Sequence, residues 1–118
     1  MSYDIQLTDP ETGDTITLDH RHNLKGGTYC LGGASQAWLN VTYNYSEHFY
    51  RVLGGKGIRT IYGMTGEESI PILKKASSKL GNDVHHDYWE PTEGNARKAL
   101  LDLVQLAKAA PHGVWDGD

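Results

Sequence analysis

Histidine and aspartate gather at two places in this sequence, near residues 20 and 86. Imidazole nitrogens and carboxylate oxygens are ligands that zinc and other divalent ions use in hydrolases and nucleases. Together the two groups offer five donors for such an ion: His20, His22, His85, His86 and Asp87. Their spacing matches no standard zinc motif, so two solvated loops are the simpler interpretation. A metal-dependent phosphodiesterase or nuclease stays open as an alternative.

Two amides stand on one side of the segment 37–45, which alternates in the manner of a strand. Asparagine is uncommon in strands, so Asn40 and Asn44 on the same face need a reason. One explanation is a solvated sheet face. The other is the floor of a polar pocket, because an amide both donates and accepts hydrogen bonds and suits a nucleobase edge or a ribose hydroxyl.

Tyrosine and tryptophan are the dominant aromatic residues of the chain, with seven Tyr and three Trp against one Phe. These side chains join an apolar ring to a polar tip, a combination common in ligand sites and interfaces. Several of them neighbour the polar segments and are candidates to stack on a nucleobase: Tyr43, Tyr45, Tyr62, Tyr88 and Trp89.

Glycines occur in several short groups along the chain, and one of these groups lies next to a lysine and an arginine. Residues 54–57 are Gly-Gly-Lys-Gly, and Arg59 follows. Glycine-rich turns let backbone N–H groups approach a phosphate, and arginine binds phosphate through two donors. The spacing fits neither the P-loop nor the dinucleotide-binding fingerprint, so ordinary turns are the simpler explanation. A phosphate contact by Lys56 and Arg59 is the alternative.

The start of the last predicted helix, residues 91–95, carries another polar group. Thr92 is suited to cap this helix, and a helix N-terminus favours anions through its free N–H groups. Capping explains Thr92 but not Gly94, which is costly inside a helix and permits close approach of a ligand or another backbone. Glu93 and Asn95 project from the same turn.

These observations predict one ligand site built from eight residues: Asn40, Tyr43, Asn44, Arg59, Tyr62, Trp89, Glu93 and Asn95. In this hypothesis Trp89 or Tyr62 stacks on a base and Arg59 contacts phosphate. The three asparagines bind hydroxyls or base edges, and Glu93 accepts a hydrogen bond from a ribose hydroxyl or an exocyclic amine. The predicted site has no catalytic residue, no metal and no cofactor.

The strands expected to position this site lie mostly in the first half of the chain. Residues 3–8 and 14–19 alternate around the turn-forming segment 9–13 and predict a β-hairpin. Residues 28–31 predict a short strand. Residues 37–45 predict the main strand, with the odd-numbered side chains on one face.

Three helices are expected after these strands. The first covers residues 46–53, the second 65–80 and the last 92–110. Ser46 and Thr92 are the predicted N-caps of the first and last helices. The last helix has the clearest apolar stripe of the three.

Smaller signals complete the predicted fold. Thr65 and Glu68 have the spacing of a capping box, and residues 58–62 predict a strand or an irregular segment. Trp115 is expected to anchor the C-terminal tail on the core. Strands followed by helices predict a single α+β domain over residues 1–118. Its small antiparallel sheet, the N-terminal hairpin plus the central strand, has two or three helices packed on one face.

Composition places the chain among globular proteins of one domain. It has 118 residues, of which 38% are hydrophobic and 22% charged. The net charge of −4 argues against a protein that coats DNA or RNA. The single cysteine, Cys30, excludes an intrachain disulfide and favours a reducing compartment. With no signal peptide and no membrane-length apolar run, a cytoplasmic protein is expected.

Five segments of the chain are distinctive: LNVTYNY (39–45), IYGMTG (61–66), ESIPIL (68–73), YWEPTEGNA (88–96) and GVWDGD (113–118). Together they resemble a family of small proteins encoded by phages and prophages, over roughly residues 37–118. The family brings no catalytic residues to carry across to this chain, and the histidine groups are not part of its pattern.

The resemblance implies a function by analogy. Small phage proteins of this size often counter host defence, and one strategy is to sequester a nucleotide immune signal, such as a cyclic nucleotide or an ADP-ribose derivative, without cleaving it. The protein would then act as a homo-oligomeric sponge in the host cytoplasm. Besides the hydrolase, a protein–protein inhibitor or adaptor of a host factor remains as an alternative.

Overall fold

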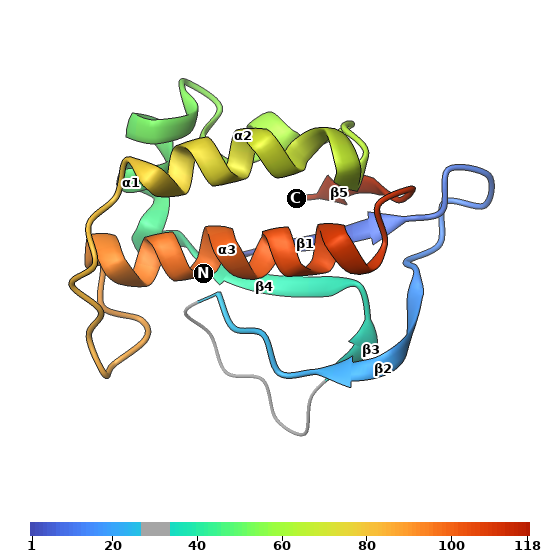
Figure 1. The fold of residues 1–118 in the computed structure, drawn as a ribbon, viewed down its shortest axis with the longest axis horizontal. Coiled ribbons are helices and arrows are strands. Elements are labelled where there is room, and N and C mark those ends of the chain that lie inside the picture. Colours follow the sequence, from blue (N-terminus) through green and yellow to red (C-terminus); the bar gives the residue numbers. More distant parts are fainter. Residues whose placement is uncertain (27–33) are drawn as a thin grey trace.

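The computed structural model describes residues 1–26 and 34–118 of the chain (Figure 1). A three-stranded antiparallel sheet has the order β4-β1-β5, so the N-terminal strand is its centre. Its members are β1 (Ser2–Thr8), β4 (Trp38–Thr42) and β5 (Val114–Gly117). The side chains of Tyr3, Ile5 and Leu7 alternate onto the buried face of β1.

The predicted N-terminal hairpin forms only at its turn. Asp9 N donates to Asp14 O, and a single bridge joins Thr8 to Thr15. Beyond Ile16 the chain leaves β1, and β2 (Thr17–His22) pairs instead with β3 (Ala34–Gln36) in a second, two-stranded sheet. The prediction that residues 14–19 pair along residues 3–8 as a hairpin was therefore wrong beyond the turn. The reason is competition for one edge, because β4 pairs with β1 from residue 2 to residue 6 and Ala37 continues that pairing by accepting from Leu7 N.

The main strand is shorter than predicted. β4 ends at Thr42, whose hydroxyl accepts from Asn44 N and caps a 3-10 helix, η1 (Tyr43–Tyr45). This turn breaks the alternation, so the prediction that Tyr43 and Tyr45 share the face of Leu39 and Val41 as strand residues was wrong. Tyr45 nevertheless reaches the core, and Asn44 is exposed.

Three helices follow. Helix α1 (Ser46–Leu53) has the predicted bounds, but its N-cap is Tyr45 rather than Ser46, whose hydroxyl bonds the Tyr3 hydroxyl. A 3-10 helix, η2 (Gly57–Ile61), occupies the segment predicted as strand or irregular. Helix α2 (Gly66–Ser78) begins with the predicted capping box. Helix α3 (Glu93–Ala109) begins at the predicted cap, Thr92.

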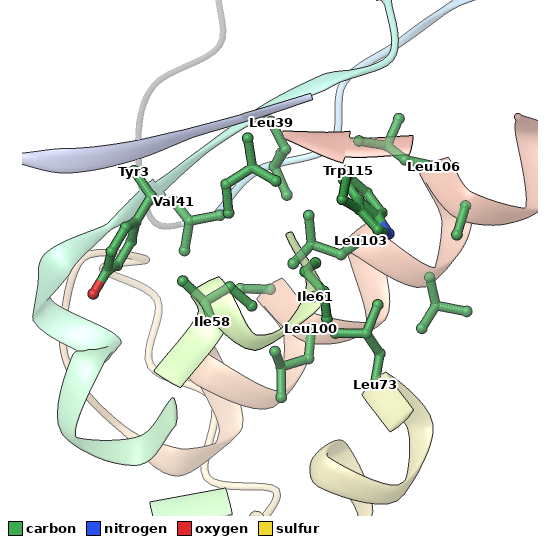
Figure 2. Packing of buried hydrophobic residues seen from close by; sticks show 14 of the residues in the cluster. Tyr3, Leu39, Val41, Ile58, Ile61, Leu73, Leu100, Leu103, Leu106 and Trp115 are labelled. Atoms are coloured by element: carbon green, nitrogen blue, oxygen red, sulfur yellow. The ribbon is translucent and has the colours of Figure 1, made fainter. Parts of the chain in front are cut away.

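The core lies between the three-stranded sheet and the helices, and Figure 2 shows side chains of β4, η2, α2 and α3 meeting there. Trp115 is 1% exposed and its ring nitrogen donates to Ser69 Oγ. The tail is thus anchored as expected, and it also forms β5, a strand that was not predicted. The architecture confirms the α+β class with helices on one face of a small antiparallel sheet.

The predicted strand 28–31, Cys30 included, lies outside the described residues. In the part of the chain that the structure covers, no helix has the length and apolar character needed to cross a membrane.

Candidate functional site

The first turn of α3 organises the loop that precedes it, residues 82–92. Asn95 is only 4% exposed, and its Oδ1 accepts from His85 N. Its Nδ2 donates to Asp87 O at 3.1 Å and to Glu90 O at 3.0 Å. Both amide hydrogens are therefore used by the protein itself, so Asn95 fixes the loop rather than offering a free amide to a ligand.

The contacts of Gly94 explain why this turn contains a glycine. A Cβ at this position would lie 2.5 Å from Val84 N and 2.6 Å from Asp83 C. Gly94 N also donates to Asp83 Oδ1. Of the two explanations for Gly94, close approach of another backbone is the one that the structure supports.

Other predicted site residues hold the same loop from outside. Asn44 Nδ2 donates to Trp89 O at 2.9 Å, and Glu93 Oε1 accepts from Gly81 N at 3.0 Å. The Tyr45 hydroxyl donates to Tyr88 O. Burial, with the Asp102 charge nearby, raises the pKa of Tyr45 to about 12, so this hydroxyl stays protonated and remains a donor.

The remaining predicted residues surround Tyr3 instead. The Tyr43 ring packs edge-on at 4.4 Å between centroids, and the Arg59 guanidinium lies 5.0 Å from the Tyr3 ring centre. Asn40 Nδ2 donates to Tyr3 O and to Asp4 Oδ1.

Arg59 and Tyr62 contact the C-terminal end of the chain. Arg59 Nε donates to Asp118 O at 2.7 Å. The Tyr62 hydroxyl is buried against Gly117 and has no hydrogen-bond partner among the described residues. The eight residues therefore form two groups: Asn44, Trp89, Glu93 and Asn95 at the 82–92 loop, and Asn40, Tyr43, Arg59 and Tyr62 around Tyr3 and the tail.

A pocket lies beside the 82–92 loop, and we call it the Tyr88 pocket. Its volume is about 290 Å³, and its walls are Lys25, Tyr45, Val84, His85, His86, Tyr88, Asn95 and Lys98. Asn95 is the one member of the predicted site on these walls. The Lys25 ammonium lies 5.5 Å from the Tyr88 ring centre, which is within cation–π range.

The two histidine rings of this pocket contact each other. His85 and His86 stack with their centroids 4.4 Å apart. His85 Nδ1 accepts from Asp87 N at 3.0 Å, so the neutral ring carries its proton on Nε2 and can donate from that nitrogen.

The two predicted histidine groups do not join into one metal site. His22 is buried, its Nε2 bonds Gln36 O and its Nδ1 accepts from Leu24 N, so both ring nitrogens are used. Among the described residues the candidate metal group is His85, His86 and Asp87, whose donor atoms lie within 4.8 Å of one another. To bind an ion through Nδ1, His85 would have to give up its bond from the Asp87 amide.

Asp102 lies one turn along α3 from Lys98. Its Oδ2 accepts from Lys25 N at 3.3 Å. Burial raises the pKa of Asp102 to about 6, although the Lys25 hydrogen bond and the Lys98 charge both favour the ionised form. The carboxylate therefore lies against the Lys25 backbone and close enough to Lys98 to counter part of that lysine's charge.

The cap at Thr92 and the polar residues beside it were predictable from the sequence, whereas the two lysines of the pocket were not predicted. Lys98 carries a usable signal, since it stands three residues after Asn95 and so shares a helix face with it. Lys25 carries none, because it enters the site through a loop that is distant in sequence.

No family model, no curated protein and no solved structure matches this chain.

Proposed function

We propose that this protein binds a nucleotide in the Tyr88 pocket and holds it without cleaving it. The observation that carries the proposal is the meeting of two lysines, two imidazoles and two phenol rings in one pocket. Ammonium groups suit phosphate, and flat rings suit a nucleobase. A volume of about 290 Å³ is at the lower end of the range for small-molecule sites.

The setting of this binding comes from the resemblance to phage proteins. The protein sequesters a nucleotide immune signal, such as a cyclic nucleotide or an ADP-ribose derivative, in the cytoplasm of the infected cell. Assembly into a homo-oligomer would bring several such pockets into one particle and raise the capacity of the sponge. DNA and RNA are not its ligands, given the net charge of −4.

Calorimetry with a panel of cyclic nucleotides and ADP-ribose derivatives tests the proposal. We expect saturable binding and roughly tenfold weaker affinity in Lys98→Ala, which corresponds to about 1.4 kcal/mol. Lys75→Ala on α2 is the matched control, because Lys75 is an exposed helical lysine that does not line the pocket. Absence of binding across the panel would refute the proposal.

The hydrolase alternative is favoured by one observation, the cluster of His85, His86 and Asp87. It requires a bound divalent ion and a cleaved product. Cobalt or zinc titration of the purified protein, followed by chromatography of the nucleotide after incubation, separates the two functions. Intact nucleotide recovered from the denatured complex supports sequestration, whereas metal-dependent cleavage that is lost in His86→Ala supports the hydrolase.

A further inference from the structure

The Tyr88 pocket is one of three pockets that adjoin along α3. The Asp102 pocket shares Lys25 and Lys98 with it and adds Asn23, Leu24 and Asp102. The His20 pocket shares Leu24 with the Asp102 pocket. Its walls are Leu18, His20, His22, Leu24, Gln105, Leu106, Lys108 and Ala109, and its volume is about 390 Å³.

The shared walls place these pockets end to end along α3, and we call this row of pockets the α3 groove. One wall is the face of α3 from Asn95 through Lys98 and Asp102 to Ala109. The other wall is the segment 18–25, which approaches α3 where Lys25 N bonds Asp102. At 1.5 Å per helical residue, the groove follows α3 for about 21 Å.

The two ends of the groove have similar chemistry. At one end the rings of His85 and Tyr88 surround the pocket. At the other end, Leu18 and Leu106 are buried and provide an apolar floor, and the imidazole of His20 is exposed beside them. Both ends therefore offer apolar or aromatic surface to a flat ring.

The middle of the groove carries two lysines, and a third, Lys108, lies at the His20 end. Lys25 and Lys98 are both exposed, and both line the Tyr88 pocket and the Asp102 pocket. Two ammonium groups between two ring-binding ends match a ligand with phosphate at its centre. Asp102 opposes this charge, so its removal is expected to strengthen the binding of such a ligand.

We infer that the α3 groove binds a two-ended ligand of the dinucleotide class. One base occupies the Tyr88 pocket, the second occupies the His20 pocket, and the phosphates lie between them at Lys25 and Lys98. This inference rests on the proposed function and extends it, because a mononucleotide would leave the His20 pocket empty.

Two probes that differ only in their second end test the inference. ADP carries one adenosine, and diadenosine diphosphate carries one on each side of the same pyrophosphate. Calorimetry is expected to give at least tenfold tighter 1:1 binding of diadenosine diphosphate to the full chain.

Variants at the far end locate the second base. Ala109→Trp is expected to fill the His20 pocket and reduce diadenosine diphosphate to the affinity of ADP, with ADP binding unchanged. Ser78→Trp is the matched control, since Ser78 and Ala109 are each the exposed last residue of their helix. His20→Ala, an exposed position, repeats the test without adding bulk.

The outcomes separate the two claims. Equal affinity for both probes, or a dinucleotide preference that survives Ala109→Trp and His20→Ala, overturns the two-ended ligand and leaves the Tyr88 pocket as a mononucleotide site. Failure of both probes to bind overturns the inference, and absence of binding across the panel of cyclic nucleotides and ADP-ribose derivatives overturns the proposed function as well.

Discussion

Replacement of tyrosine by phenylalanine is expected to have different effects on stability at two positions where the tyrosine hydroxyl is buried. The Tyr62 hydroxyl has no hydrogen-bond partner among the described residues, whereas the Tyr45 hydroxyl donates to Tyr88 O. A buried hydroxyl without a partner destabilises the folded state, and removal of a bonded one leaves its acceptor unsatisfied. Tyr62→Phe is therefore expected to leave the free energy of unfolding unchanged or to raise it.

Tyr45→Phe is expected to lower the free energy of unfolding by about 1–2 kcal/mol. Urea denaturation of both variants measures the difference. A loss of stability in Tyr62→Phe as large as that in Tyr45→Phe would show that the Tyr62 hydroxyl has a partner in the folded protein.

The raised pKa of Asp102 predicts that the stability of the protein depends on pH. Its pKa is raised from 3.8 to about 6 in the folded protein, so between these values the folded state binds more protons than the unfolded state. Stability linked to this group is greatest below pH 3.8 and is lost as the pH rises through about 6. The rise of the Asp102 pKa from 3.8 to about 6 corresponds to at most about 3 kcal/mol. Partial exposure of the carboxyl group reduces this contribution to about 1 kcal/mol.

Asp102→Asn removes the titration and keeps an oxygen that can accept from Lys25 N. We expect this variant to be about 1 kcal/mol more stable than the parent at pH 7.5 and equal to it near pH 4. Chemical denaturation across this pH range is the measurement. A parent that gains stability over the variant as the pH rises would contradict the assignment.

At the scale of elements, the 82–92 loop and α3 behave as one unit because Gly94 lets their backbones meet. Gly94→Ala would place a Cβ within 2.6 Å of two backbone atoms, which cannot yield as a flexible side chain can. We expect a loss of at least about 2 kcal/mol in unfolding free energy, together with weaker nucleotide binding, since Val84, His85 and Tyr88 line the pocket.

Gly55→Ala is the control for this substitution, because Gly55 is exposed and a Cβ there meets nothing within 4 Å. Its stability should stay close to that of the parent in thermal unfolding followed by circular dichroism. Equal effects of the two substitutions would mean that the loop tolerates a shift away from α3.

Elements with local signals were predictable from the sequence. The capping box of Thr65 and Glu68 and the cap at Thr92 each involve residues three apart, so the sequence contains both partners of every bond. The pairing of β1 was not predictable in this way. One of its partners is β5, which lies more than 100 residues away in the sequence. The other edge of β1 could pair with β4 or with the predicted hairpin strand, and no local sequence pattern decides between them.

In the whole molecule, four of the eight residues of the predicted site lie together, and the other four lie elsewhere. Asn44, Trp89, Glu93 and Asn95 do meet at one loop, but they build it, and the pocket beside it takes its charge from Lys25 and Lys98. Arg59 and Tyr62 lie with the C-terminal strand instead. Gly94 near the helix start indicated a close approach at this turn, whereas the position of Lys25 depends on the path of the segment 18–25.

Nuclear magnetic resonance of the ¹⁵N-labelled protein titrated with ADP tests the nucleotide pocket most directly. We expect saturable shifts of the backbone amides of Lys25, of residues 84–88 and around Lys98, while the amides of Arg59 and Tyr62 stay unmoved. A titration that moves Arg59 and Tyr62 while the Tyr88 pocket stays silent, or that moves no amide at all, would contradict it.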